Sequence, residues 1–140
     1  MATGTAGSTA RQSTQPVVHY LRKTITYNNP GTGVALTVGV VPAGSVIIGA
    51  YAAVVTAFNG GGSDLLDIYI TTNSATTQAM SGMSLATVGL VLIADDLATW
   101  TAGYSASEQT VKAIYTDGNA DSSAGSAEIV ITYIPGNNPS

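Results

Sequence analysis

The sequence predicts an all-β protein: a single-domain β-sandwich or jelly roll of about seven or eight strands, preceded by an extended N-terminal arm. Short apolar runs, many of them alternating, are separated by turn residues every 8–12 positions, which is typical of sandwiches and jelly rolls. No segment predicts a convincing long helix. With 140 residues there is room for one domain with a real core. We expect an arm over residues 1–16 and a β-sandwich domain over residues 17–140.

The arm, Met1–Pro16, consists mainly of Ala, Gly, Ser, Thr and Gln with one arginine, Arg11. It offers too little apolar surface to offset the entropy lost on ordering, so we expect it to be disordered unless something holds it. Contact with its own domain is the alternative to contact with another protein. The first strand follows at Val17–Tyr27, which is rich in β-branched and aromatic residues and ends at the turn Asn28–Gly31.

The next strands are Val34–Val40 and, after a Pro-Ala-Gly break, Ser45–Phe58. Strict alternation along Ser45–Phe58 divides its apolar residues between two faces: Val46, Ile48, Ala50, Ala52 and Val54 on one, and Ile47, Tyr51, Ala53 and Val55 on the other. Apolar residues on both faces predict a strand covered on both sides, by the core and by a partner.

The glycine-rich hairpin Asn59–Gly62 leads into Asp64–Thr71. Residues Thr72–Ala86 are small and polar and predict a long loop with one helical turn near Ala79–Met83. The remaining strands are expected at Val88–Ala94, Ala98–Thr101, Gln109–Thr116 and Ser126–Ile134. Pro135 ends the last of them.

Charge is scarce and unevenly placed. Charged residues make up 9% of the chain, against roughly 25% in ordinary soluble domains. Three of the four cations precede residue 24, and all eight carboxylates follow residue 63. A basic arm before an acidic body favours docking by charge complementarity and surface burial. The net charge of −4 argues against nucleic-acid binding.

The chain lacks the apolar runs that membranes and secretion require. Its most apolar stretch is broken by Gly39, Pro42 and Gly44, so it predicts no membrane helix, and the N-terminus lacks a signal-peptide pattern. We therefore expect a soluble protein made in a cytoplasm.

Residues for catalysis are few. There is no cysteine, and His19 is the single histidine, so a His-based metal trio is excluded and any Ser-His-Asp triad must use His19. Asp95 and Asp96 are adjacent and point opposite ways if they lie on a strand, which favours a solvated turn. Gly60–Gly62 lacks the lysine and helix of a phosphate loop. We expect neither an enzyme nor a cofactor.

One spacing matches an oxygen-ligand pattern. Asp117, Asn119, Asp121 and Glu128 occupy positions 1, 3, 5 and 12 of a calcium loop. Position 6 is Ser122 where the pattern requires glycine, and the flanking segments predict strands where the pattern requires helices. An Asp-Gly hairpin turn is therefore favoured over a calcium site.

The segments "TVGVVPAGSVIIGA", "VVTAFNGGGSDLLDIY" and "SAGSAEIVITYIP" resemble small all-β virion proteins of tailed bacteriophages. The resemblance covers about residues 24–135. Such proteins are known mostly as head decoration (cement) proteins, often trimers on the outer capsid lattice. The resemblance therefore implies a virion protein on the capsid surface, made in the host cytoplasm, whose partners are the major capsid protein and its own copies.

For a cement protein we expect the interface at the basic arm and first strand, through Arg11, Val17, Val18, Tyr20, Arg22 and Lys23. Two other readings remain open. A tail or head–tail junction component, such as a fibre or adaptor, would be present in few copies. A carbohydrate-binding module would use Trp100, Tyr104 and the loop Thr72–Ala86 as a sugar platform. An enzyme would require a cleft uniting His19 with Asp95 or Asp96.

Overall fold

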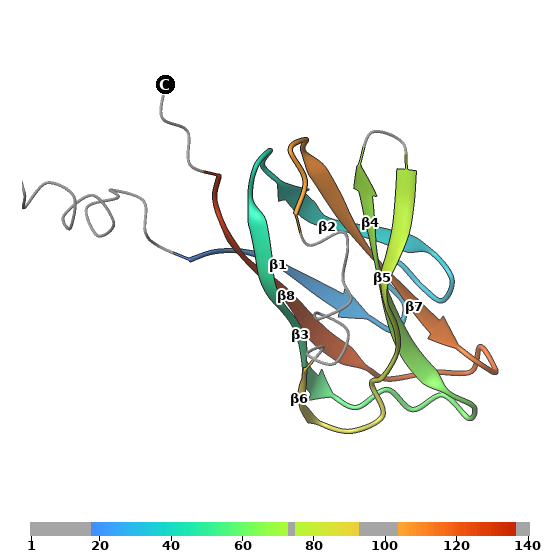
Figure 1. The fold of residues 1–140 in the computed structure, drawn as a ribbon. Helices are drawn as coiled ribbons and strands as arrows, with labels where there is room; N and C mark the ends of the chain where they lie inside the picture. The colour runs from blue at the N-terminus through green and yellow to red at the C-terminus, as the bar shows by residue number, and fades with distance from the viewer. Residues whose placement is uncertain (1–17, 73–74, 93–103, 137–140) are drawn as a thin grey trace, which may run out of the picture.

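Two four-stranded antiparallel sheets pack face to face in the computed structural model (Figure 1), which describes residues 18–72, 75–92 and 104–136. The strands are β1 (His19–Thr26), β2 (Ala35–Val41), β3 (Val46–Thr56), β4 (Asp64–Thr72), β5 (Ala75–Ser84), β6 (Gly89–Leu92), β7 (Gln109–Asp117) and β8 (Ser126–Ile134). Sheet A has the order β1-β8-β3-β6, and sheet B has the order β2-β7-β4-β5. The predicted all-β fold is confirmed. Within the described ranges no helix is long and apolar enough to cross a membrane.

The strand order is that of a jelly roll, in which one long hairpin is rolled up. The first strand pairs with the last, β2 with β7, β3 with β6, and β4 with β5. Two further pairings, β3 with β8 and β4 with β7, close the roll. Consequently β1 begins beside the end of β8, with His19 opposite Tyr133. We call this end of the sandwich the terminal end.

The core lies between the sheets and follows the alternation of the sequence. Alternate residues of β4, β7 and β8 point inward, as the sequence predicts, and most are fully buried. The inward apolar residues of these three strands are Leu66, Ile68, Ile70, Val111, Ala113, Tyr115, Ala127, Ile129, Ile131 and Tyr133. Burying one such aliphatic side chain contributes about 1.5–3 kcal/mol.

The predicted phase of β3 is wrong in its first half. A β-bulge shifts the pairing with β8 between Ile47 and Gly49, so Ile47 joins Ala50, Ala52 and Val54 in the core. Val46 and Ile48, expected on the same face as Ala50, are instead 43% and 42% exposed. An extra residue on one strand changes which side chains face inward, and strict alternation cannot anticipate it.

The predicted loop Thr72–Ala86 is also wrong. Residues Ala75–Ser84 form β5, which pairs with β4 from Thr72↔Ala75 to Leu65↔Ser84. Small polar residues carry little strand signal of their own, so pairing with β4 determines this strand. The helical turn expected at Ala79–Met83 is therefore absent. The strand expected at Ala98–Thr101 lies outside the described residues.

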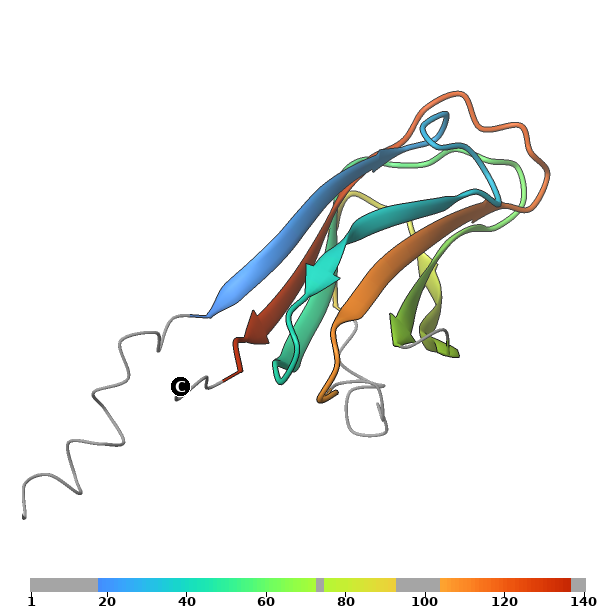
Figure 2. The same cartoon turned by 90° about the horizontal axis from the view of Figure 1, so that it is seen from above.

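Three loops meet at the end of the sandwich opposite the terminal end, which we call the loop end (Figure 2). The buried carboxylate of Asp64 links the β3–β4 loop and the β7–β8 loop to β7. Its Oδ1 accepts hydrogen bonds from the Tyr115 hydroxyl at 2.6 Å and the Ser122 hydroxyl at 3.1 Å, and its Oδ2 accepts one from the Gly60 amide at 2.8 Å. Burial, then the bond to Asp64, raises the pKa of Tyr115 above its ordinary value. The phenol therefore stays protonated as the donor.

Asp117 lies beside this cluster and organises the turn after β7. Its carboxylate accepts hydrogen bonds from the backbone amides of Asn119 and Ser122, and its own amide donates to Thr32 in the β1–β2 loop. Burial alone would raise the pKa of Asp117, but these amide donors outweigh it and lower the pKa below its ordinary value. The carboxylate is thus ionised and acts as a turn acceptor.

Close approach of the loops requires Gly60. A Cβ atom at this position would lie 2.5 Å from an oxygen of Asp117 and 2.6 Å from an oxygen of Asp64. Such distances are far inside van der Waals contact, so no larger residue fits without moving both carboxylates. Gly60 therefore lets the β3–β4 loop reach both acids.

We predict that Asp64→Ala lowers the free energy of unfolding by about 2–4 kcal/mol, because it leaves the buried Tyr115 hydroxyl and the Gly60 amide without their acceptor. Asp121→Ala is the control. Asp121 also accepts a hydrogen bond from a loop amide, that of Gly61. Because Asp121 is exposed, the loss of its carboxylate should lower the free energy of unfolding by under about 1 kcal/mol. Urea unfolding of both variants measures the difference. Equal losses would contradict the structural role of Asp64.

Candidate interaction surface

Of the residues expected to form the interface, Tyr20, Arg22 and Lys23 lie on β1, an edge strand of sheet A, and Val18 directly precedes it. Val18 and Tyr20 are 44% and 61% exposed, and Arg22 and Lys23 are exposed as well. An edge strand presents unpaired backbone groups that another chain's strand can bind. Arg11 and Val17 lie outside the described residues. Four of the six predicted residues are thus shown to be accessible, which an interface requires.

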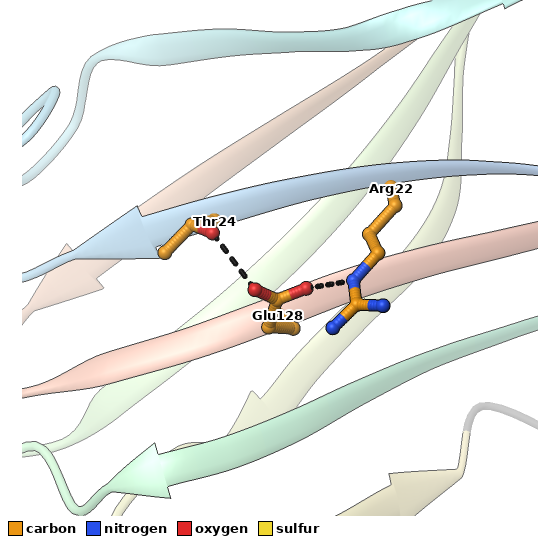
Figure 3. Close-up of polar contacts among 3 residues, drawn as sticks. All are labelled: Arg22, Thr24 and Glu128. Carbon is orange, nitrogen blue, oxygen red and sulfur yellow. Dashed lines mark hydrogen bonds and ion pairs between the residues drawn. The ribbon is translucent and has the colours of Figure 1, made fainter.

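An ion pair joins β1 to β8 on the outer side of sheet A (Figure 3). Arg22 donates through Nε to Glu128, and the Thr24 hydroxyl donates to the other carboxylate oxygen at 3.0 Å. The hydrogen bond from Arg22, followed by that from Thr24, lowers the pKa of Glu128 below its ordinary value. The pair is largely exposed, so its role is to fix the two side chains more than to stabilise the fold.

A shallow hollow of about 440 Å³ lies over this pair and is lined by Arg22, Lys23, Thr24 and Glu128. Two cations against one carboxylate leave it with a net positive charge. Its polar lining suits a charged group of a partner protein better than an apolar ligand.

Four exposed apolar side chains form a continuous row across the terminal end of sheet A. Ile134 of β8 pairs with Val46 of β3, and Val46 forms an isolated bridge to Tyr104. Continuing the β1–β8 register by one residue places Val18 opposite Ile134. We call Val18, Ile134, Val46 and Tyr104 the terminal row; their exposed fractions run from 43% to 59%.

Sequence reasoning assigned only Val18 of this row to an interface. One signal could have identified Ile134. It falls out of phase with the buried series from Ala127 to Tyr133, on the outward face of the last strand. Val46 could not be found in this way, because the bulge in β3 hides its true phase.

The residues singled out for other chemistry are not assembled into a site by the described part of the chain. His19 packs its ring at a tilt against that of Tyr133, with centroids 5.7 Å apart, at the start of β1. Asp95, Asp96 and Trp100 lie outside the described residues. The loop proposed as part of a sugar platform is mostly strand β5, and Tyr104 belongs to the terminal row.

The four candidate calcium ligands are not brought together either. Glu128 lies in sheet A and binds Arg22 and Thr24, whereas Asp117 ends β7 in sheet B and binds turn amides. Asp121 accepts a hydrogen bond from Gly61. Among residues 18–72, 75–92 and 104–136, no three His, Asp or Glu side chains are arranged to hold a metal ion.

No protein-family model matches the sequence, and no curated protein matches it. Solved structures are similar in fold. A chain of the cyanophage Pam1 capsid has a TM-score of 0.62 and 15% identity, with 89% of each chain covered. A chain of the Ralstonia phage GP4 capsid has a TM-score of 0.59 and 18% identity, and the match covers 87% of this chain and 86% of that one. A chain of the Helicobacter pylori bacteriophage KHP30 capsid has a TM-score of 0.58 and 14% identity, and the match covers 86% of this chain and 90% of that one.

These similarities show a shared fold. Because coverage is nearly complete in both directions, each match is between whole chains of similar length and not with one domain of a larger protein.

We predict that Arg22→Gln lowers the urea midpoint above pH 4.5, the ordinary pKa of Glu128, and that the difference from wild type shrinks at lower pH. The folded pKa of Glu128 is depressed, so its contribution is present above the unfolded pKa and is lost as pH falls through the folded pKa. Lys23→Gln removes one positive charge from the neighbouring position, and its urea midpoint should differ from that of wild type by an amount that does not change with pH over this range. A pH-independent effect of Arg22→Gln would contradict the assignment.

Proposed function

We propose that this chain is a structural protein of a bacteriophage virion, specifically a decoration (cement) protein that binds the outer surface of the capsid. The observation that carries the proposal is the whole-chain fold similarity to chains of three phage capsids. It agrees with the low charge content and with the exposed terminal row, both of which favour a chain that functions against other proteins.

A cement protein stabilises the capsid by binding to it and not by catalysing a reaction. A ligand that binds only the assembled lattice stabilises it by mass action, by about 2.7 kcal/mol for each site when its free concentration is 100 times the Kd. A docking surface that bridges subunits of the major capsid protein meets that condition, because dissociated subunits do not present it. We place the contact on the terminal row and on β1, through Val18, Tyr20, Arg22 and Lys23, with the homotrimer as the unit that binds.

The N-terminal arm is the second contact in this proposal. Residues 1–16 contain Arg11 and precede Val18 and β1 in the sequence. An extended segment adds contact area without a larger domain and can add a strand to a neighbouring sheet.

We predict that purified particles contain hundreds of copies of this chain at repeated lattice positions. Quantitative mass spectrometry of particles and imaging at subnanometre resolution measure this. A handful of copies at one vertex would instead support a tail or head–tail junction component, and absence from the particle would contradict a virion role.

We predict further that deleting residues 1–16 leaves a folded domain but lowers particle occupancy at least tenfold, or about 1.4 kcal/mol of binding free energy. Deleting residues 137–140 is the matched control, because it shortens the chain at the same end of the sandwich. Circular dichroism checks the fold, and sedimentation with undecorated particles measures binding. Undiminished binding by the truncated protein would rule out a contact through the arm.

A further inference from the structure

The two sheets differ in the side chains that they expose. Eleven large apolar side chains are exposed among the described residues, and nine of them lie on or directly beside sheet A: Val18, Tyr20, Val46, Ile48, Val55, Val88, Leu90, Tyr104 and Ile134. The other two are Val34, in the β1–β2 loop, and Val40, on β2. Scattered exposed apolar residues are ordinary on protein surfaces, whereas their concentration on one of the two sheets indicates an interaction surface.

Strand β3 contributes to this concentration through two bulges. The pairing with β8 shifts between Ile47 and Gly49 and again between Val54 and Thr56. Each shift adds a residue to the outer side, Ile48 in the first and Val55 in the second, and Val55 is 62% exposed. Gly49 between them keeps the surface low, because a Cβ there would lie 2.7 Å from the hydroxyl of Thr132.

Leu90 of β6 extends the apolar surface to the far edge of sheet A. It pairs with Ala53 and is 64% exposed, and Val88 directly before β6 is 59% exposed. The outer side of sheet A therefore carries apolar side chains at both margins. The Arg22–Glu128 ion pair joins β1 to β8 on the same side of the sheet.

The outer side of sheet B is more polar. Its strands present Thr37, Thr71, Thr110, Thr116, Lys112 and Asp67. The same side also carries the large apolar residues Leu65, Tyr69 and Ile114, which are half-buried. Threonine is a strong β-former that remains compatible with water, so this side suits solvent.

Charge divides in the same direction. The outer side of sheet A carries Arg22 against Glu128. The β1 edge adds Lys23, which pairs with buried Ile129 and so lies on the inner side of that edge, and the three groups have a net charge of +1. The other described residues carry Lys112 against five carboxylates, for a net charge of −4. The excess positive charge therefore lies at the β1 edge of the apolar side, where it complements acidic side chains of a partner.

We propose that the outer side of sheet A is the face that docks on the capsid, and that its partner there is an apolar protein surface with acidic side chains opposite Arg22 and beside Lys23 at the β1 edge. This inference rests on the proposed function. The outer side of sheet B then faces solvent.

The size of the face agrees with a second contact through the arm. Four strands about eight residues long cover roughly 500 Å², at about 4.8 Å between strands and 3.3 Å per residue. A stable interface buries about 800 Å² per partner. Residues 1–17 join the fold at Val18, in the terminal row, where additional contact would extend this face.

The test compares two valines that are alike except for the sheet they lie on. Val46 of β3 is 43% exposed and Val40 of β2 is 42% exposed, and they flank the same Pro42–Ser45 turn. Val46→Asp should lower binding to undecorated particles at least tenfold, and Val40→Asp should bind as wild type does. Leu90→Asp, at the far margin of the face, should repeat the loss. Thermal unfolding identifies any variant that fails to fold, and Val46→Thr and Val40→Thr serve as milder substitutes with the same expected order.

Charge reversal tests the chemistry of the partner. Lys23→Glu should weaken particle binding and reduce its dependence on salt, because it places a carboxylate against acidic side chains. Lys112→Glu, on the outer side of sheet B, should change neither. Equal effects of the two substitutions would overturn the acidic partner.

The outcomes separate the inference from the proposed function. If wild type binds particles and Val46→Asp and Leu90→Asp bind equally well, the docking face is wrong and the decoration function stands. Loss of binding by Val40→Asp alone would assign docking to sheet B and overturn the inference. If wild type does not bind particles, the proposed function fails first. If Val46→Asp instead dissociates an oligomer of the isolated protein without affecting particle binding, the face is a contact between copies and the inference is overturned.

Discussion

The buried carboxylate of Asp64 is the constraint on which the arrangement of both sheets depends. It accepts the Tyr115 hydroxyl, the Ser122 hydroxyl and the Gly60 amide, and so joins β4 and β7 of sheet B to the loop that carries the chain into β8 of sheet A. Asp64 and Asp117 are themselves paired across β4 and β7. The position of that loop fixes where β8 begins, and β8 lies between β1 and β3 at the centre of sheet A. One polar cluster therefore connects the two layers at the loop end.

A buried acid is tolerated here because its oxygens are satisfied. Unpaired, it would cost several kcal/mol, whereas hydroxyl and amide donors make its burial compatible with a stable fold. The same end of the molecule carries Asp117, whose oxygens are held by backbone amides. Hydrogen bonding within the fold accounts for a spacing that, in sequence alone, resembles a metal-binding loop.

The sequence predicts the fold class and most strands because inward residues such as Ile68, Val111 and Ile129 recur with a period of two. It fails where the determining interaction is not local. The β5 strand depends on its partner β4, and the bulges in β3 depend on its pairing with β8. The Asp64–Tyr115 hydrogen bond joins residues 51 positions apart, and no local pattern marks it. The candidate surface follows the same division: exposed Tyr20 and Arg22 are readable from the first strand, whereas Val46 looks like a core residue until the bulge is known.

Pairing of the first strand with the last also has a consequence for how the chain is made. During synthesis, β1 leaves the ribosome more than a hundred residues before β8, an interval of roughly 5–20 s at about 5–20 residues per second. Until β8 emerges, sheet A lacks one of its two central strands, and β1 and β3 both have an open edge where β8 will pair. Long-range pairing of this kind folds slowly and exposes apolar strands to other nascent chains. The jelly roll therefore completes its core only after β8 has emerged, and the strands made earlier expose their inward apolar residues until then.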